Sequence, residues 1–329
     1  MQYGTIVHYI LERFFGEYTK EECLSLEEDK FQKIVCAYLA EYAVKYFGEE
    51  QLESNSFTYR LKTILDNVMH LMKHIMEELS QSEFFVADCE LKIGEDIPSY
   101  TIVLPDGHKI AVCGSVDRVD IMQRADITYL RIIDYKTGTK QFKLSDILYG
   151  INLQMLLYLH SIEASGGDKY GEIVPAGILY MPATVPYISS DSLKSIDKLP
   201  DELNKKLKMN GLLLKDTEII HGMDKTDVAT YIPVKIKAGE PVSSTSLATL
   251  AEFGKIFKKV DMLIAEMGKN IYNGNIEAKP LKGGHDSCEY CPYDSVCAYR
   301  QSNPITCFSV DNKTVIEEIT NEINGKEEE

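Results

Sequence analysis

Two consecutive stretches decide the fold: residues 109–122, KIAVCGSVDRVDIM, and residues 129–138, YLRIIDYKTG. Apolar residues alternate with polar ones in both, the period of two that is typical of a β-strand. Asp126 lies between them as a turn signal, so the two stretches predict strands that meet across a hairpin. Upstream, residues 84–104 add two further stretches with this alternation. We therefore expect a β-sheet core.

Helical periodicity surrounds this sheet. The opening segment has apolar residues at helical spacing from Ile6 to Phe14, which places His8 and Glu12 one turn apart. Ser25 followed by Glu28 has the pattern of a capping box and predicts a helix that runs to Phe47. Further helices are expected over residues 57–79, 145–162 and 244–272, and further strands over residues 174–181 and 231–236. The pattern predicts an α/β protein in which helices flank the sheet.

The chain length allows one large domain or two small ones, and we expect one. We predict N-terminal helices over 1–82, a core over 83–183, an irregular insertion over 184–220, and a C-terminal helix with a cysteine loop over 221–310. The insertion is expected because that stretch is rich in Ser, Lys and Asp and has weak periodicity. Residues 311–329 are expected to form a solvated tail.

Composition limits the function classes. The 329 residues carry a formal net charge of -16, which argues against a general attraction to phosphate backbones, because such affinity comes from Lys and Arg. No stretch approaches the roughly 18 uninterrupted apolar residues of a membrane-spanning helix, and no signal peptide is recognisable. We therefore expect a cytoplasmic protein without membrane attachment. The eight cysteines, three of them clustered near the end, indicate thiols kept reduced for metal rather than a disulfide framework.

Two acidic positions on the central strands are the strongest candidates for chemistry. Asp134 and Lys136 are two apart on one strand, so both side chains project from the same face. Asp117 lies on the preceding strand, where its carboxylate could converge with that of Asp134. Two adjacent carboxylates repel unless a cation lies between them, and mostly oxygen ligands suit Mg²⁺ or Mn²⁺. The alternative for Asp117 is a salt bridge at the strand end, and for Asp120 we favour a surface ion pair.

These motifs, in this order, carry a family resemblance. The pattern G-x-x-D-R-x-D, then I-D-Y-K-T-G, then a helix with Gln154-x-x-x-Tyr158, resembles the RecB-like branch of the PD-(D/E)xK nucleases. The resemblance implies a restriction-endonuclease-like fold, a mixed central β-sheet flanked by helices, here with extra N-terminal and C-terminal helices. It also implies that Asp117, Asp134 and Lys136 are the catalytic residues.

The resemblance assigns further residues. A G-x-x-x-H segment near the start supplies a metal ligand in the family, which corresponds to Gly4 and His8, so His8, Asp117 and Asp134 are the predicted metal ligands. In the family the Q-x-x-x-Y pair helps to place the nucleic acid. The alternative for Gln154 and Tyr158 is a helix face that packs on the sheet, but a glutamine among leucines needs a polar partner. For Glu90, on the strand before the hairpin, a supporting role at the site is the alternative, but we favour an exposed strand residue.

The cysteine cluster consists of Cys288, Cys291 and Cys297. This spacing lets one loop wrap a metal centre, and by itself it favours zinc. The resemblance implies a [4Fe-4S] cluster instead, which would join the two ends of the domain and whose fourth cysteine precedes the G-x-x-x-H helix. That cysteine is missing here, so we expect a domain cut from a larger protein and an incomplete cluster in this chain. Buried, inert thiols are expected at Cys36, Cys89 and Cys113.

Within the family, the similarity is greatest to AddB-type nuclease domains of AddAB helicase-nucleases. It implies hydrolysis of phosphodiester bonds in single-stranded DNA during double-strand break processing and recombination, with a helicase subunit as partner. The acidic surface is then expected, because the metals bring local positive charge and the partner holds most of the DNA. The alternatives are a stand-alone RecB-like exonuclease of the CRISPR-adaptation type and a non-catalytic module that only binds DNA or a partner.

Overall fold

The structure is a computed structural model that describes residues 3–138, 140–184, 199–243, 245–297 and 304–327. Its centre is a six-stranded mixed sheet in the order β1-β4-β5-β6-β7-β10. The strands are β1 (Phe85–Ile93), β4 (Gly114–Arg124), β5 (Ile127–Lys136), β6 (Glu172–Pro182), β7 (Asn210–Leu214) and β10 (Leu247–Ala248). The β4–β5 pair is antiparallel, as the sequence predicted, and β5 and β6 run parallel. The predicted α/β class and the mixed sheet are confirmed.

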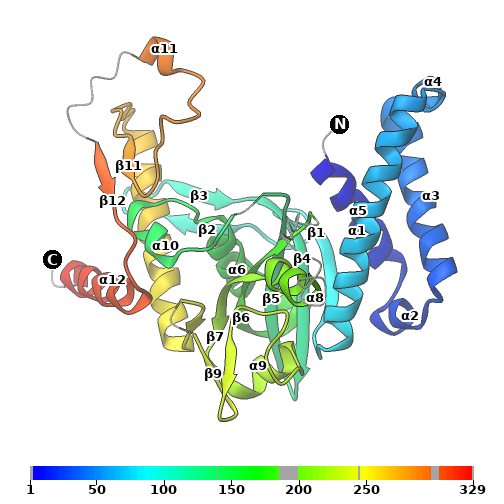
Figure 1. The fold of residues 1–329 in the computed structure, drawn as a ribbon. Coiled ribbons are helices and arrows are strands. Elements are labelled where there is room, and N and C mark those ends of the chain that lie inside the picture. The colour runs from blue at the N-terminus through cyan, green and yellow to red at the C-terminus, as the bar shows by residue number, and fades with distance from the viewer. Residues whose placement is uncertain (1–2, 139, 185–198, 244, 298–303, 328–329) are drawn as a thin grey trace.

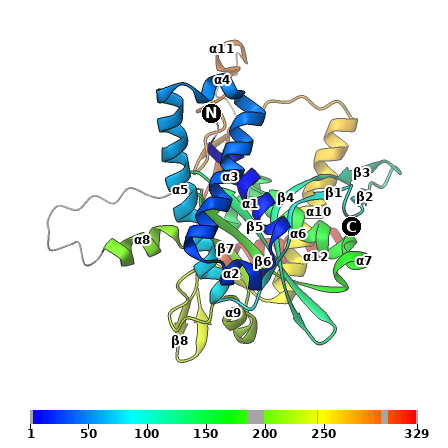
Figure 2. The same cartoon turned by 90° about the vertical axis from the view of Figure 1, so that its right-hand side faces the viewer.

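Helices lie on both sides of this sheet (Figures 1 and 2). One side carries α1 (Tyr3–Glu17), α2 (Lys20–Ser25), α3 (Glu28–Phe47), α4 (Glu49–Leu52) and α5 (Asn55–Ser80). The other side carries α10 (Leu250–Tyr272) and α12 (Asn312–Glu327), and α6 (Gln154–Ser165) packs on β6. The remaining helices are short: α7 (Gly167–Tyr170), α8 (Leu199–Leu207), α9 (Thr217–Met223) and α11 (Asp294–Cys297). Among the described helices, none has both the length and the apolar character needed to cross a lipid bilayer.

The described residues also form three small two-stranded sheets. They pair β2 (Tyr100–Val103) with β3 (Lys109–Val112), β8 (Lys235–Lys237) with β9 (Glu240–Val242), and β11 (Leu281–Gly283) with β12 (Ile305–Cys307). The strand predicted over residues 109–122 is therefore split at Cys113 into β3 and β4, and its first part leaves the central sheet. The strand predicted over residues 231–236 is also shorter than expected, because only its end belongs to β8.

Two predictions about the second half of the chain are wrong. The described part of the stretch predicted to be irregular, residues 184–220, contains α8 and a strand of the central sheet, β7, whose Leu212 and Leu213 are fully buried. The predicted tail is the helix α12, which packs against α10 and buries Val315, Ile319 and Ile323. Lysines and glutamates on the opposite face of this helix concealed the apolar stripe.

Local chemistry moves three helix boundaries. The helix predicted from residue 145 is interrupted. Its first part is the 3-10 turn η1 (Leu144–Tyr149), and Gly150 and Asn152 then take left-handed φ values of 68° and 55°. The α-helix α6 begins only after this break. The helix predicted from residue 244 begins at Leu250, where Thr249 and Glu252 form a capping box. The predicted capping box at Ser25 is wrong, since the N-cap of α3 is Glu27 and makes no side-chain hydrogen bond.

A buried ion network joins α5 to the sheet. Asp120 accepts hydrogen bonds from Arg118 at 2.6 and 2.7 Å and from Arg131 at 2.8 and 3.0 Å, and both arginines also contact Glu78 on α5. All four side chains are fully buried. Asp120 does form ion pairs, but they are buried, so the prediction of a surface pair is wrong. The two carboxylates balance the two guanidinium groups, which is the condition for burying such charges.

Candidate active site

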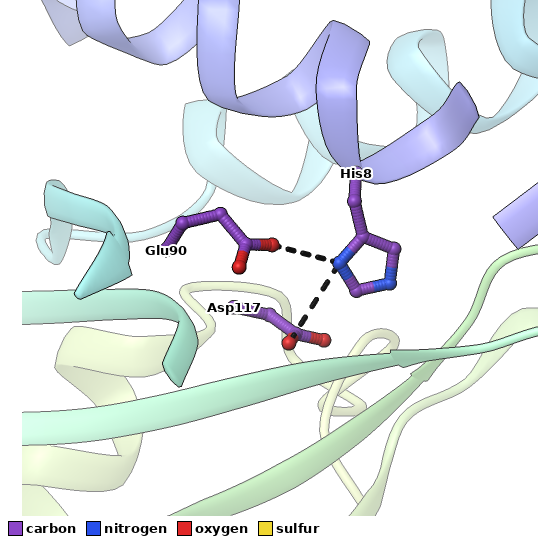
Figure 3. A group of neighbouring side chains, drawn as sticks. All are labelled: His8, Glu90 and Asp117. Carbon is purple, nitrogen blue, oxygen red and sulfur yellow. Dashed lines mark hydrogen bonds and ion pairs between the residues drawn. The ribbon is translucent and has the colours of Figure 1, made fainter. Parts of the chain in front are cut away.

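Helix α1 brings His8 to the sheet. Ile6, Val7, Ile10 and Phe14 are fully buried and fix the helix against the core, while the His8 side chain is 29% exposed beside the strands. His8 Nδ1 lies 2.9 Å from Glu90 Oε1 on β1 and 3.7 Å from Asp117 Oδ1 on β4. Figure 3 shows the imidazole pointing from the helix towards both carboxylates. Residues from three separate elements therefore meet at one point.

Glu90 was predicted to be an exposed strand residue, and this prediction is wrong. Its side chain is 28% exposed, and it accepts hydrogen bonds from His8 Nδ1 and from the Ser115 hydroxyl, both at 2.9 Å. The backbone of Glu90 is left-handed, with φ at 52°, and the register of β1 shifts between Val86 and Asp88. Such irregularities redirect a side chain and are common at functional sites. The strict alternation of the sequence gives no sign of them.

Asp117 lies next to Asp134, as the strand pattern predicted. Arg118 pairs with Ile133 in the β4–β5 register, which places the two aspartates at neighbouring positions, and Asp117 Oδ2 accepts a 2.9 Å hydrogen bond from the Tyr135 N–H. Burial and then the negative charge of Asp134 raise the pKa of Asp117 from 3.8 to about 6. Negative charge therefore accumulates here at neutral pH.

His8 responds to the same charges. The hydrogen bond to Glu90 raises the pKa of His8, burial lowers it, and the negative charge of Asp117 raises it again, so the pKa lies above its ordinary value. The hydrogen bond to His8 in turn lowers the pKa of Glu90, against the effect of burial. The carboxylates around His8 therefore favour the charged form of its imidazole.

The donors fit a divalent cation. His8, Glu90 and Asp117 each offer one ligand atom, and these atoms lie within 4.8 Å of one another. One imidazole nitrogen with several carboxylate oxygens suits Mg²⁺ or Mn²⁺, and a cation would relieve the repulsion that raises the pKa of Asp117. Asp134, a predicted ligand, lies outside this group, and its 6% exposed carboxylate forms an ion pair with Lys136. The structure thus adds Glu90 to the predicted set and places Asp134 at its edge.

Two of these three residues, His8 and Glu90, line an open cavity of about 990 Å³. His8 lines it from α1, and Glu90, Ser115 and Lys136 line it from the strands of the sheet. Lys140 also lines it, and its amino group lies 5.1 Å from the centre of the Tyr180 ring, next to that of Lys136 at 5.8 Å. The cavity therefore offers carboxylates and ammonium groups side by side, which is suitable for a metal and a phosphate together.

Gln154 and Tyr158 occupy different surroundings. Gln154 is the first residue of α6 and is exposed, so the argument that it needs a partner among leucines is wrong. Tyr158 packs on Gly114, the first residue of β4, so closely that a Cβ there would lie 2.2 Å from the tyrosine hydroxyl oxygen. Neither side chain lines the cavity beside His8. Tyr158 therefore contacts the strand of Asp117 three residues before that aspartate.

The three clustered cysteines lie apart from this site. They belong to the loop between β11 and β12, which stands away from α1 in Figure 1. Within the described residues, the sulfur atoms of Cys288, Cys291 and Cys297 do not form a group with the spacing of metal ligands. Of the thiols predicted to be buried and inert, Cys113 is exposed and Cys36 and Cys89 are partly exposed. That prediction is wrong for Cys113.

Similarity to known proteins extends over almost the whole chain. The family model described as the PD-(D/E)XK nuclease superfamily matches residues 1–298. The chain belongs to this superfamily. The match covers the α1 helix, the central sheet and the cysteine loop, so this nuclease domain includes every predicted site residue.

Longer proteins also share this nuclease domain. Three relatives each carry the name of the B subunit of an ATP-dependent helicase/deoxyribonuclease. The protein from Thermoanaerobacter sp. (strain X514) is 35% identical over 90% of this chain, that from Alkaliphilus oremlandii 32% over 97%, and that from Clostridium kluyveri 33% over 99%. The chain spans 26% of the first relative and 29% of the other two. The similarity therefore concerns one nuclease domain of AddB-type proteins.

Proposed function

We propose that this nuclease domain hydrolyses phosphodiester bonds of single-stranded DNA as a metal-dependent exonuclease. The observation that carries the proposal is the convergence of His8, Glu90 and Asp117 beside the Asp134–Lys136 pair, next to an open cavity that His8, Glu90 and Lys136 line. A divalent cation held there would supply Lewis acidity and neutralise charge on the phosphate. His8, Asp117 and Asp134 are the proposed metal ligands, and Glu90 is added as a ligand or as the group that orients His8.

The residues of the chain have distinct roles in this proposal. Glu90 holds the imidazole of His8 in place through the 2.9 Å hydrogen bond at Nδ1, the ring nitrogen that also faces Asp117. The Tyr135 N–H holds Asp117 at 2.9 Å. Lys136, bound to Asp134 and 29% exposed towards the cavity, stabilises the negative charge that develops on the phosphate. Gln154 and Tyr158 are proposed to position the strand, with Tyr158 acting through its contact with Gly114.

We infer the wider context from the relatives. Their name couples a helicase to a deoxyribonuclease, which supports a role in processing double-strand breaks for recombination within a larger, AddAB-type cytoplasmic complex. In that longer protein, Cys288, Cys291 and Cys297 would join an upstream cysteine to hold a [4Fe-4S] cluster. Their two- and five-residue gaps support this. Iron and sulfide analysis of the full-length protein, purified without oxygen, tests it, and absence of both would contradict it.

The experiment for the catalytic proposal is digestion of end-labelled single-stranded DNA with Mg²⁺ or Mn²⁺. Asp134→Ala and Lys136→Ala are each expected to slow cleavage, by more than roughly a hundredfold for Asp134→Ala, because a charged group at the reacting centre is removed. Asp126→Ala is the matched control, since Asp126 is exposed at the β4–β5 turn. Equal activity of the wild type and the two active-site variants would refute the proposal, as would full activity in EDTA.

A further inference from the structure

Three tyrosines from two helices form a connected row, which we call the tyrosine ladder: Tyr9 on α1, and Tyr42 and Tyr46 on α3. The ring centres of Tyr9 and Tyr42 are 5.1 Å apart, and those of Tyr42 and Tyr46 are 4.4 Å apart. Tyr42 is buried at 7% exposure, whereas Tyr46 is 54% exposed. The middle ring of the row is therefore buried, and the last ring reaches solvent.

The tyrosine ladder and the metal-binding group share one cavity. Tyr9, Tyr42 and Tyr46 line it from the side of α1 and α3, opposite Glu90 and Lys136 on the sheet side. His8 is the neighbour of Tyr9 on α1, so one end of the ladder adjoins the proposed cleavage site. A ligand that extends from this site along the cavity would meet the rings next.

Packing of the core explains only part of this row. Tyr42 fills space between the helices, and the Tyr9 hydroxyl donates to Glu41 at 2.7 Å. Burial does not explain Tyr46, because more than half of its side chain is exposed. An exposed ring that continues an ordered row into a cavity is a surface on which another flat ring can stack.

Lys45 places a positive charge beside the tyrosine ladder. Its amino group lies 5.1 Å from the centre of the Tyr46 ring and 5.9 Å from that of Tyr9. The side chain is exposed and has a flexible stem, so it can move from the ring to a phosphate while the ring accepts a base. Aromatic faces beside a lysine are the combination that proteins use to bind single strands.

We propose that the tyrosine ladder, with Lys45, stacks the unpaired bases of the single-stranded DNA that leads to the cleavage site; this rests on the proposed function. Single-stranded DNA is favoured because a duplex hides its base faces in the stack, whereas a single strand offers them to aromatic rings. Stacking also explains how a chain with a net charge of -16 can bind DNA, because stacking gives affinity without a basic surface. The ladder would keep the strand in place beside His8.

The absence of tryptophan from the sequence allows a direct test. Tyr46→Trp places one fluorophore at the open end of the ladder, and the Asp134→Ala background prevents cleavage during titration. We expect oligothymidylate to quench this fluorescence. An abasic oligonucleotide of equal length and a blunt duplex should quench it much less, because neither presents free base faces. Equal quenching by oligothymidylate and by the abasic strand would overturn the proposal.

Affinity measurements provide the second readout. In the same background, Tyr46→Ala is expected to weaken binding of oligothymidylate about 5- to 150-fold, the loss of roughly one stacked base, while Tyr46→Phe restores it. Tyr272→Ala is the matched control, because Tyr272 is 53% exposed and lies on α10, on the other side of the sheet. Binding by Tyr46→Ala within twofold of the parent would overturn the proposal.

The two proposals can fail separately. With Asp134 restored, Tyr46→Ala should raise the KM for single-stranded DNA and leave kcat at saturating DNA largely unchanged, because Tyr46 does not touch the reacting group. Quenching of the Tyr46→Trp fluorophore, together with no metal-dependent cleavage by the wild type, would contradict the nuclease proposal and leave the stacking proposal standing. Metal-dependent cleavage with a KM that Tyr46→Ala does not change would contradict the stacking proposal and leave the nuclease proposal standing.

Discussion

Asp117→Asn should stabilise the metal-free protein while it abolishes cleavage. The structure shows why: burial and the charge of Asp134 raise the pKa of Asp117 from 3.8 to about 6, so the folded state disfavours its ionised form. At about 1.36 kcal/mol per pKa unit, the penalty is roughly 3 kcal/mol above pH 7. Asparagine keeps an acceptor for the Tyr135 N–H but must also be buried, which costs about 1–2 kcal/mol. We expect a net gain of about 1–2 kcal/mol.

The gain has a definite pH dependence. Because the folded pKa lies above the unfolded one, the penalty of wild-type Asp117 is complete above about pH 7, falls to about half near pH 5, and disappears below the unfolded value. The difference between Asp117→Asn and wild type should therefore shrink as the pH is lowered. Each kcal/mol corresponds to a melting shift of roughly 2–4 °C in a chain of this size.

The assay is urea unfolding in EDTA at about pH 8 and about pH 5, followed by thermal unfolding with Mn²⁺. Manganese should raise the melting temperature of the wild type and leave that of Asp117→Asn nearly unchanged, because the variant has lost a ligand. A variant less stable than the wild type at pH 8, or one stabilised by Mn²⁺ as much as the wild type, would show that Asp117 neither carries this penalty nor binds the metal.

Three further predictions concern other parts of the molecule. Asp120→Ala leaves two fully buried arginines short of a partner and should cost about 3–5 kcal/mol in urea unfolding, and a loss below 1 kcal/mol would contradict the network. Burial lowers the pKa of His160, but hydrogen bonds to Asp261 and Glu163 outweigh burial and raise this pKa from 6.5 to about 9. The charged histidine therefore stabilises the fold fully below pH 6.5, and this stabilisation is lost as the pH rises to 9. His160→Gln should flatten the melting temperature over that range, and an unchanged slope would exclude the effect. Glu90→Ala should weaken Mn²⁺ binding about 10- to 100-fold in calorimetry, and unchanged affinity would remove Glu90 from the site.

The parts of the site that follow from strand geometry could be predicted from the sequence. The period of two placed Asp134 and Lys136 on one face, and the adjacent strand brought Asp117 beside them. The buried face of α1 could also be predicted, because Ile6, Val7 and Ile10 repeat with the helical period. Local pattern is enough wherever neighbours in sequence decide which side chains share a face.

Features that depend on distant packing could not be predicted. The left-handed backbone at Glu90 turns a residue that the alternation assigns to solvent towards His8, which is 82 positions away in the sequence. The burial of Asp120 depends on Glu78 from α5, and a polar surface pattern concealed α12, which meets α10 only in the folded chain. Each case joins segments that no short window contains.

The most direct test of the central claim is a crystal soaked in Mn²⁺ and measured at a wavelength that reveals anomalous scattering. We predict an anomalous peak in contact with His8 and Asp117 that is absent in crystals of Asp117→Asn. No peak at saturating Mn²⁺, or a peak remote from both side chains, would contradict it.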